Sequence, residues 1–128
     1  MRVILADDER NVRSAVKLLL EQEQNVEIVC ETEKLTGVIE KFSDLRPDLL
    51  LIDWDLRLPA MNRAMVMLLR HRCPGMRILA MSSLPESRDH ALQSGVDAFV
   101  SKTDPPEVLI QSIRQVYSFS PRPYSYKR

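Results

Sequence analysis

The sequence predicts an α/β fold, a doubly wound five-stranded parallel sheet with helices on both faces. Short runs rich in β-forming residues alternate with segments whose apolar residues recur at helical spacing, as in chains built from β-α-β units. The apolar run at 49–52 is unbroken, which is typical of a strand covered on both faces. A chain of 128 residues, 45% hydrophobic and 28% charged, has the size and composition of one globular domain.

Five segments have the character of strands. The first runs directly into a group of acids, the second alternates in polarity as an edge strand does, and the third follows Pro47. The predicted strands are 2–6 (RVILA), 26–30 (VEIVC), 48–53 (DLLLID), 76–82 (MRILAMS) and 96–101 (VDAFVS).

Helical spacing marks the segments between and after these strands. Four of them have a clear apolar face, and these are 12–20, 35–42, 61–69 and 109–117. The segment 86–94 has only Ala91 and Leu92 to anchor it, so we expect a weakly held helix there. Before the last helix, Asp104 is a candidate cap, with Pro105 at the first helical position and Glu107 at the third. We therefore predict one domain over 1–118 and a tail or linker stub over 119–128.

Charge and composition argue against several classes of function. Eighteen basic residues balance eighteen acidic ones, so there is no global positive field for nucleic acid or an anionic membrane. The apolar runs are too short to cross a bilayer, and the N-terminal run does not resemble a secretory signal. Cys30 and Cys73 form no disulfide framework and fit a reducing compartment. We expect a cytoplasmic protein that by itself binds neither nucleic acid nor membrane.

Polar residues stand where four of the predicted strands end. Asp7 and Asp8 follow the first strand, Asp53 ends the third, Ser82 ends the fourth and Lys102 follows the fifth. Parallel strands bring these ends to one edge of the sheet, where such folds bind ligands. Clustered carboxylates repel one another unless a cation lies among them, and their oxygens suit Mg²⁺. With Mg²⁺ and a lysine to neutralise charge, one carboxylate can attack a phosphoryl group and form an acyl phosphate.

Each of these residues also has a simpler interpretation. The acids at 7–9 favour the N-terminus of the helix that follows, Ser82 suits a turn, and Lys102 suits a solvated surface. Their coincidence at the strand ends is what favours a phosphoryl site.

Four stretches, VILADDE, RPDLLLID, ILAMSS and GVDAFVSK, occur in this order at fitting intervals. Together they resemble the receiver domain of two-component response regulators, the phosphoacceptor modules of bacterial signalling, and are most similar to receivers of the LuxR-like subfamily. The resemblance covers about residues 2–118. It implies a CheY-like (flavodoxin-like) (βα)5 fold with strand order 2-1-3-4-5. It also implies phosphorylation by a sensor histidine kinase, and no enzymatic activity beyond the domain's own phosphorylation and dephosphorylation.

The resemblance assigns roles to the acids by position. Asp53 corresponds to the phosphoacceptor, and Asp7 and Asp8 correspond to the acidic pair around Mg²⁺, with Asp8 as the direct ligand. The backbone carbonyl of Asp55, two residues past the acceptor, corresponds to a further Mg²⁺ ligand.

The resemblance also assigns a switch. Ser82 corresponds to the switch hydroxyl, Lys102 to the lysine that contacts the phosphoryl group, and Phe99 to the switch aromatic. A plain core side chain of the fifth strand is the alternative for Phe99. The surface of the fourth helix, fifth strand and fifth helix is then expected to control a second copy of the chain or an attached output domain.

The choice between Asp53 and Asp55 as acceptor rests on position. The family's Asp-x-x-hydrophobic-Pro pattern fits DLRLP, which begins at Asp55. The end of the apolar run and the intervals to Ser82 and Lys102 fit Asp53 better. We therefore predict Asp53, and Pro59 then stands two residues late, in a loop longer than the family's pattern.

Two other functions compete with this prediction. The Asp53-Trp54-Asp55 stretch superficially matches the Asp-x-Asp of haloacid-dehalogenase-type phosphatases, with Asp53 as nucleophile and Asp55 as acid. Those enzymes usually carry the motif on the first strand, whereas it follows the third here. The other rival is a pseudo-receiver, a protein-interaction module that is no longer phosphorylated.

Overall fold

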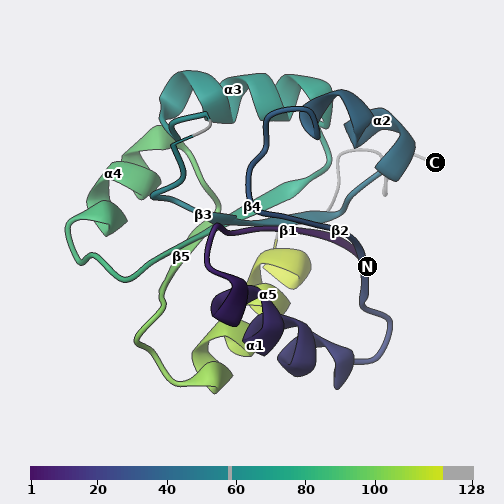
Figure 1. Ribbon diagram of the computed structural model, residues 1–128, viewed down its shortest axis with the longest axis vertical. Helices are drawn as coiled ribbons and strands as arrows, with labels where there is room; N and C mark the ends of the chain where they lie inside the picture. Colours follow the sequence, from purple (N-terminus) through teal and green to yellow (C-terminus); the bar gives the residue numbers. More distant parts are fainter. Residues whose placement is uncertain (58, 120–128) are drawn as a thin grey trace.

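A parallel sheet forms the centre of the computed structural model, which describes residues 1–57 and 59–119 (Figure 1). Within these residues the sheet has five strands in the order β2-β1-β3-β4-β5, which confirms the predicted topology. The strands are β1 (Arg2–Ala6), β2 (Glu27–Thr32), β3 (Leu49–Asp53), β4 (Arg77–Ser82) and β5 (Ala98–Ser101).

Helices cover both faces of the sheet (Figure 1). One layer consists of α1 (Arg10–Glu21) and α5 (Pro106–Phe119). The other consists of α2 (Phe42–Leu45), α3 (Arg63–Arg72) and α4 (Ser87–Ser94). This arrangement is the doubly wound one that the alternation of elements predicts.

Alternate side chains of the strands build two separate cores. In β3, Leu50 and Ile52 join the core beneath α2, α3 and α4, while Leu49 and Leu51 join the core beneath α1 and α5. All four are almost completely buried. The unbroken apolar run is therefore explained by a strand that needs an apolar side chain on either face.

The predicted second helix is the main correction to the secondary structure. Instead of a helix over 35–42, the chain forms turns, a short 3₁₀ segment η1 (Ile39–Lys41) and the single-turn α2. Gly37 has φ of +85°, a left-handed conformation that a continuous α-helix cannot contain. Leu35 and Phe42 are nevertheless buried in the core, so the apolar pattern marks the buried residues correctly and the helix wrongly.

The last helix begins at Pro106, one residue later than predicted. The carboxylate of Asp104 accepts a hydrogen bond from the backbone N–H of Ser101 at 3.2 Å, within the turn that leads from β5 to α5. The helix reaches Phe119, one residue past the predicted domain boundary, and the rest of the predicted tail, 120–128, lies outside the described residues. Within the described residues, no helix is long and apolar enough to cross a membrane.

Helix α4 has few apolar contacts, as predicted. Ala91 is fully buried, but Leu92 is 39% exposed, and the other buried members of the helix are Ser87 and Ser94. The helix ends at Gly95 in the left-handed conformation that terminates helices.

Candidate functional site

The register of the sheet brings the predicted site residues to one edge. Ala6 pairs with Ile52, so Asp7 lies beside Asp53 at the ends of β1 and β3. Hydrogen bonds from Trp54 N to Met81 O (2.8 Å) and from Lys102 N to Ser82 O (2.9 Å) extend the ladder past the strand ends. Residues that are far apart in the sequence therefore lie close together at this edge.

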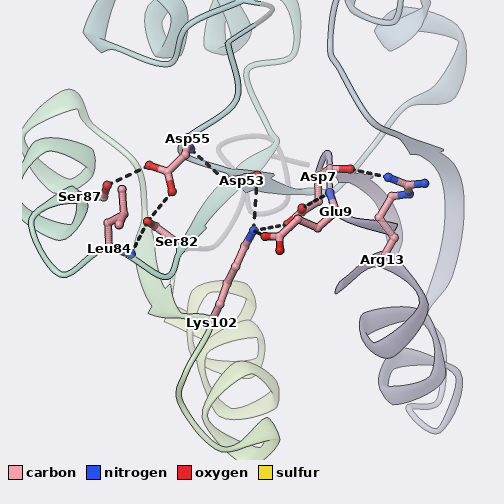
Figure 2. Close-up of polar contacts among 9 residues, drawn as sticks. All are labelled: Asp7, Glu9, Arg13, Asp53, Asp55, Ser82, Leu84, Ser87 and Lys102. Carbon is pink, nitrogen blue, oxygen red and sulfur yellow. Dashed lines mark hydrogen bonds and ion pairs between the residues drawn. The ribbon is translucent and has the colours of Figure 1, made fainter. Parts of the chain in front are cut away.

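Asp53 is a buried carboxylate with two different surroundings. It is 2% exposed. Its Oδ1 accepts a hydrogen bond from the backbone N–H of Asp55 at 2.9 Å, while its Oδ2 lies 3.4 Å from the Lys102 ammonium (Figure 2). One oxygen is thus held by the loop after β3, and the other faces the charged residues that follow β1 and β5.

Lys102 reaches from the end of β5 into a group of acids (Figure 2). Its Nζ lies 2.8 Å from Asp7 Oδ2 and 2.9 Å from Glu9 Oε1. Burial alone lowers the pKa of this ammonium, but its hydrogen bonds to Asp7 and Glu9 and the charge of Asp53 outweigh burial, so its pKa is raised. Lys102 therefore remains a cation within the site.

The surroundings of Asp53 make it harder to ionise. Burial raises the pKa of Asp53 to about 6, and the neighbouring charge of Asp7 and a hydrogen bond with Asp8 act in the same direction. The hydrogen bond from Asp55 N–H and the charge of Lys102 oppose this rise without cancelling it. The positive charge near Asp53 therefore does not fully stabilise its ionised form.

Four acids at this edge can offer ligand oxygens to one cation. Carboxylate oxygens of Asp7, Asp8, Glu9 and Asp53 all lie within 4.8 Å of one another. Among the described residues, the buried Asp7 Oδ2 receives no hydrogen bond beyond its ion pair with Lys102. Several carboxylates that share one ammonium suit a hard divalent cation such as Mg²⁺, which takes oxygen ligands and retains some water. The residues present therefore fit the predicted metal.

Backbone and side-chain contacts of Asp7 fix the start of α1. Asp7 Oδ1 accepts the backbone N–H of Glu9 at 2.8 Å, and Asp7 O accepts Nη1 of Arg13 at 2.7 Å (Figure 2). Glu9 is the N-cap of α1 but makes no side-chain capping hydrogen bond. Its carboxylate contacts Lys102, so the acids at 7–9 do more than favour a helix N-terminus.

Ser82 and Asp55 form a separate hydrogen-bonded group on the α4 side of Asp53 (Figure 2). Ser82 is 1% exposed, and its hydroxyl donates to Asp55 Oδ2 at 2.6 Å. The other oxygen of Asp55 accepts the hydroxyl of Ser87 at 3.0 Å. The Asp55 carboxylate is thus turned toward two serines, which does not suit a general acid acting beside Asp53 as in a phosphatase.

Two aromatic residues connect the site to α4. Phe99 of β5 is partly buried and packs against the core beneath α4, with the guanidinium carbon of Arg88 5.8 Å from its ring centroid. Trp54, the residue after Asp53, is buried and donates its indole N–H to Nδ1 of His90 at 2.9 Å. Phe99 is therefore partly a core side chain, and it also lies against α4.

Sequence reasoning missed two contributors to this region. Glu9 stands in the same acidic run as Asp7 and Asp8, and its place soon after the first strand is the available signal. Ser87 had no such signal, because its role depends on how α4 lies against the loop after β3.

The chain is similar in sequence to known response regulators. A sequence profile of the response regulator receiver domain matches residues 3–114. The oxygen regulatory protein NreC of Staphylococcus epidermidis is 26% identical over 121 residues, which cover 91% of this chain and 55% of NreC. The response regulator protein VraR of Staphylococcus saprophyticus is 27% identical, with 92% of this chain and 57% of VraR covered. The chain therefore spans about half the length of these relatives.

Solved structures show the same fold. The isolated receiver domain of RcsB from Salmonella enterica serovar Typhimurium, in the presence of the phosphomimetic BeF₃⁻, matches with a TM-score of 0.81 at 21% identity, over 95% of this chain and 91% of that one. A LuxR-family two-component response regulator from Aurantimonas sp. SI85-9A1 matches with a TM-score of 0.80 at 22% identity, over 92% and 85% of the two chains. The profile match covers most of the sequence, and the strand order is the one that the resemblance implies. The chain belongs to the receiver domains of two-component response regulators, which are signalling domains rather than classical enzymes.

Proposed function

We propose that this receiver accepts a phosphoryl group from a sensor histidine kinase onto Asp53, in a reaction that depends on Mg²⁺. The observation that carries the proposal is the position of Asp53. It is a buried carboxylate at the carboxyl edge of the sheet, between a group of acids and a lysine. The experiments below also test the alternative of an interaction module that is never phosphorylated.

The reaction requires in-line attack by a carboxylate oxygen. An oxygen of Asp53 forms a bond to phosphorus, the bond from phosphorus to the donor's leaving group breaks, and the leaving group departs with the bonding electrons. The product is an acyl phosphate on Asp53. Lys102, whose Nζ lies 3.4 Å from Asp53 Oδ2, can pair with the oxygens of the transferred group and offset their charge.

Asp7, Asp8 and Glu9 supply further oxygens around Asp53, and with Asp53 they would hold the metal. Mg²⁺ bound there supplies positive charge that favours the ionised acceptor and the negative charge developing on the phosphoryl oxygens. The backbone carbonyl of Asp55 remains part of this proposal as a further ligand.

Asp53 is favoured over Asp55 by the contacts of the two side chains. Asp53 faces the lysine and the acids, whereas both carboxylate oxygens of Asp55 accept serine hydroxyls. A nucleophile needs an oxygen that is free to approach phosphorus, and only the surroundings of Asp53 combine this with nearby cationic charge.

The signal is proposed to leave the site through Ser82 and Phe99. Phosphorylation adds about two negative charges and new acceptor oxygens at the sheet edge. Ser82 and Lys102 then move toward these oxygens, and Phe99 repacks inward. The surface of α4, β5 and α5 changes its affinity for a second copy of the chain or an output domain as a consequence.

Intact-mass measurement tests the acceptor. Wild type, Asp53→Asn and Asp55→Asn are incubated with a small acyl-phosphate donor and Mg²⁺, with a chelator as the control reaction. We expect one added phosphoryl group on wild type and on Asp55→Asn, and none on Asp53→Asn or in chelator.

Three outcomes would contradict the proposal. Full phosphorylation of Asp53→Asn with an inert Asp55→Asn would move the acceptor to Asp55. A wild type that takes up neither phosphoryl nor beryllofluoride would instead be a pseudo-receiver. Repeated turnover of a phosphate ester would indicate a phosphatase.

A further inference from the structure

The hydroxyl of Ser82 already donates its single hydrogen to another side chain. It donates its one hydrogen to Asp55 Oδ2 at 2.6 Å and accepts the backbone N–H of Leu84 at 2.9 Å (Figure 2). A hydroxyl has a single hydrogen to donate, so Ser82 cannot donate to a phosphoryl oxygen while it donates to Asp55. The acceptor that it must leave is a carboxylate, which forms stronger hydrogen bonds than neutral groups do.

The Asp55 carboxylate also holds the start of α4 by a hydrogen bond. Asp55 Oδ1 accepts the hydroxyl of Ser87, the first residue of α4, at 3.0 Å. Ala91 is the fully buried apolar residue of α4, so the position of this helix depends largely on polar contacts. Asp55 therefore joins the predicted switch hydroxyl to the start of the helix that the switch must move.

Phosphorylation of Asp53 would act directly on this group. The backbone N–H of Asp55 already contacts Asp53 Oδ1 at 2.9 Å, so the two residues are neighbours in space as well as in sequence. A phosphoryl group on Asp53 brings about two negative charges near the Asp55 carboxylate and offers Ser82 a competing acceptor. Both effects weaken the hold of Asp55 on Ser82.

We propose that Asp55 is a positioning residue that competes with the phosphoryl group for the Ser82 hydroxyl and holds α4 in its unphosphorylated position. The proposal rests on phosphorylation of Asp53. When Ser82 turns to the phosphoryl oxygens, the Asp55 carboxylate loses one of its two serine partners beside a new negative charge. The attachment of Ser87 then weakens, and the start of α4 is released.

The affinity for beryllofluoride at saturating Mg²⁺ tests the competition, with Trp54 fluorescence as the readout. Asp55→Ala frees the Ser82 hydroxyl, and we expect it to bind beryllofluoride about tenfold more tightly than wild type, the size of one hydrogen bond to a charged group. Asp55→Asn removes the charge but retains an oxygen for Ser82 and an N–H for Ser87. We expect it to gain clearly less, about twofold to threefold, and it guards against a folding defect in the alanine variant.

A double-mutant cycle separates the hydroxyl from the charge. In a Ser82→Ala background there is no hydroxyl to compete for, so Asp55→Ala should gain only about as much as Asp55→Asn does in wild type. Ser83→Ala, at the exposed neighbouring serine, is the matched control and should leave the tenfold gain unchanged.

Two results would overturn the inference, and they differ in what else they affect. An equal gain with and without the Ser82 hydroxyl would mean that Asp55 acts by charge alone, while the proposed function would stand. Failure of wild type to bind beryllofluoride with Mg²⁺ would remove the proposed function and this inference together.

Discussion

The buried carboxylate of Asp53 lowers the stability of the metal-free domain once it is ionised. Its pKa is raised to about 6 chiefly by burial, whereas the same group in the unfolded chain titrates near 3.8. Because the folded state holds this proton more tightly, the contribution of Asp53 to stability is fully present below the unfolded pKa. It is lost as the pH rises through the folded pKa, so between about pH 4 and pH 6 the residue increasingly destabilises the metal-free domain.

Asp53→Asn should therefore stabilise the metal-free domain at neutral pH. Asn keeps an oxygen for the N–H of Asp55 and removes the buried charge, so we expect the free energy of unfolding to rise by about 1–3 kcal/mol at pH 7.5. The gain should fall through pH 6 and vanish near pH 4. Denaturant unfolding in chelator at several pH values measures it.

Asp44→Asn, at an exposed acid of α2, is the control and should show no such pH-dependent gain. A gain from Asp53→Asn that is independent of pH, or a loss of stability at pH 7.5, would contradict the account of this carboxylate.

At the scale of elements, the sequence predicts well whatever depends on local pattern. The strands, the edge position of β2 and three helices, α1, α3 and α5, follow from apolar spacing, and each lies within a few residues of its predicted bounds. Helix α4 also lies at its predicted position, although its apolar spacing is weak. The segment around Gly37 does not, because its apolar spacing fits a helix although its backbone turns into the left-handed region. The apolar spacing there predicts which side chains are buried, but it does not predict the backbone conformation.

The site divides in the same way. The acids and Lys102 are predictable because they stand at strand ends, whose positions the register fixes. The Asp55 group is not predictable, because it depends on the path of the loop after β3 and the orientation of α4. Contacts between a loop and a weakly packed helix depend on tertiary structure and leave no periodic pattern in the sequence.

Helix α4 should respond to occupation of Asp53. Amide exchange over residues 84–104, compared with and without beryllofluoride and Mg²⁺, should differ in wild type, while α1 serves as the internal reference. Ser82→Ala and Lys102→Ala should still bind the ligand, though more weakly, yet lose most of this difference because each removes a contact to the phosphoryl oxygens.

Ser83→Ala should keep the response. If the wild type shows no difference although Asp53 is demonstrably occupied, the domain would be a phosphoacceptor without this switch.

At the scale of the whole molecule, the site is a concentration of charge in a chain that is balanced overall. Eighteen basic and eighteen acidic residues cancel, yet four acids gather at the edge where β1, β3 and β5 end, and three of them pair with the one ammonium of Lys102. Like charges held together by the fold oppose the fold, so a cation bound among them should stabilise the entire domain.

The last prediction is that Mg²⁺ raises the thermal stability of the chain and that Asp8→Ala abolishes most of this effect. A cation that binds only the folded state adds RT ln(1 + [Mg²⁺]/Kd), about 2 kcal/mol at thirty times Kd, or roughly 7 °C in Tm for a domain of this size. Asp8→Ala removes one exposed ligand and some repulsion, so in chelator it should be at least as stable as wild type. Asp44→Ala should retain the full Mg²⁺ shift. An equal Mg²⁺ shift in Asp8→Ala, measured by calorimetry in Mg²⁺ and in chelator, would mean that Asp8 does not belong to the metal site.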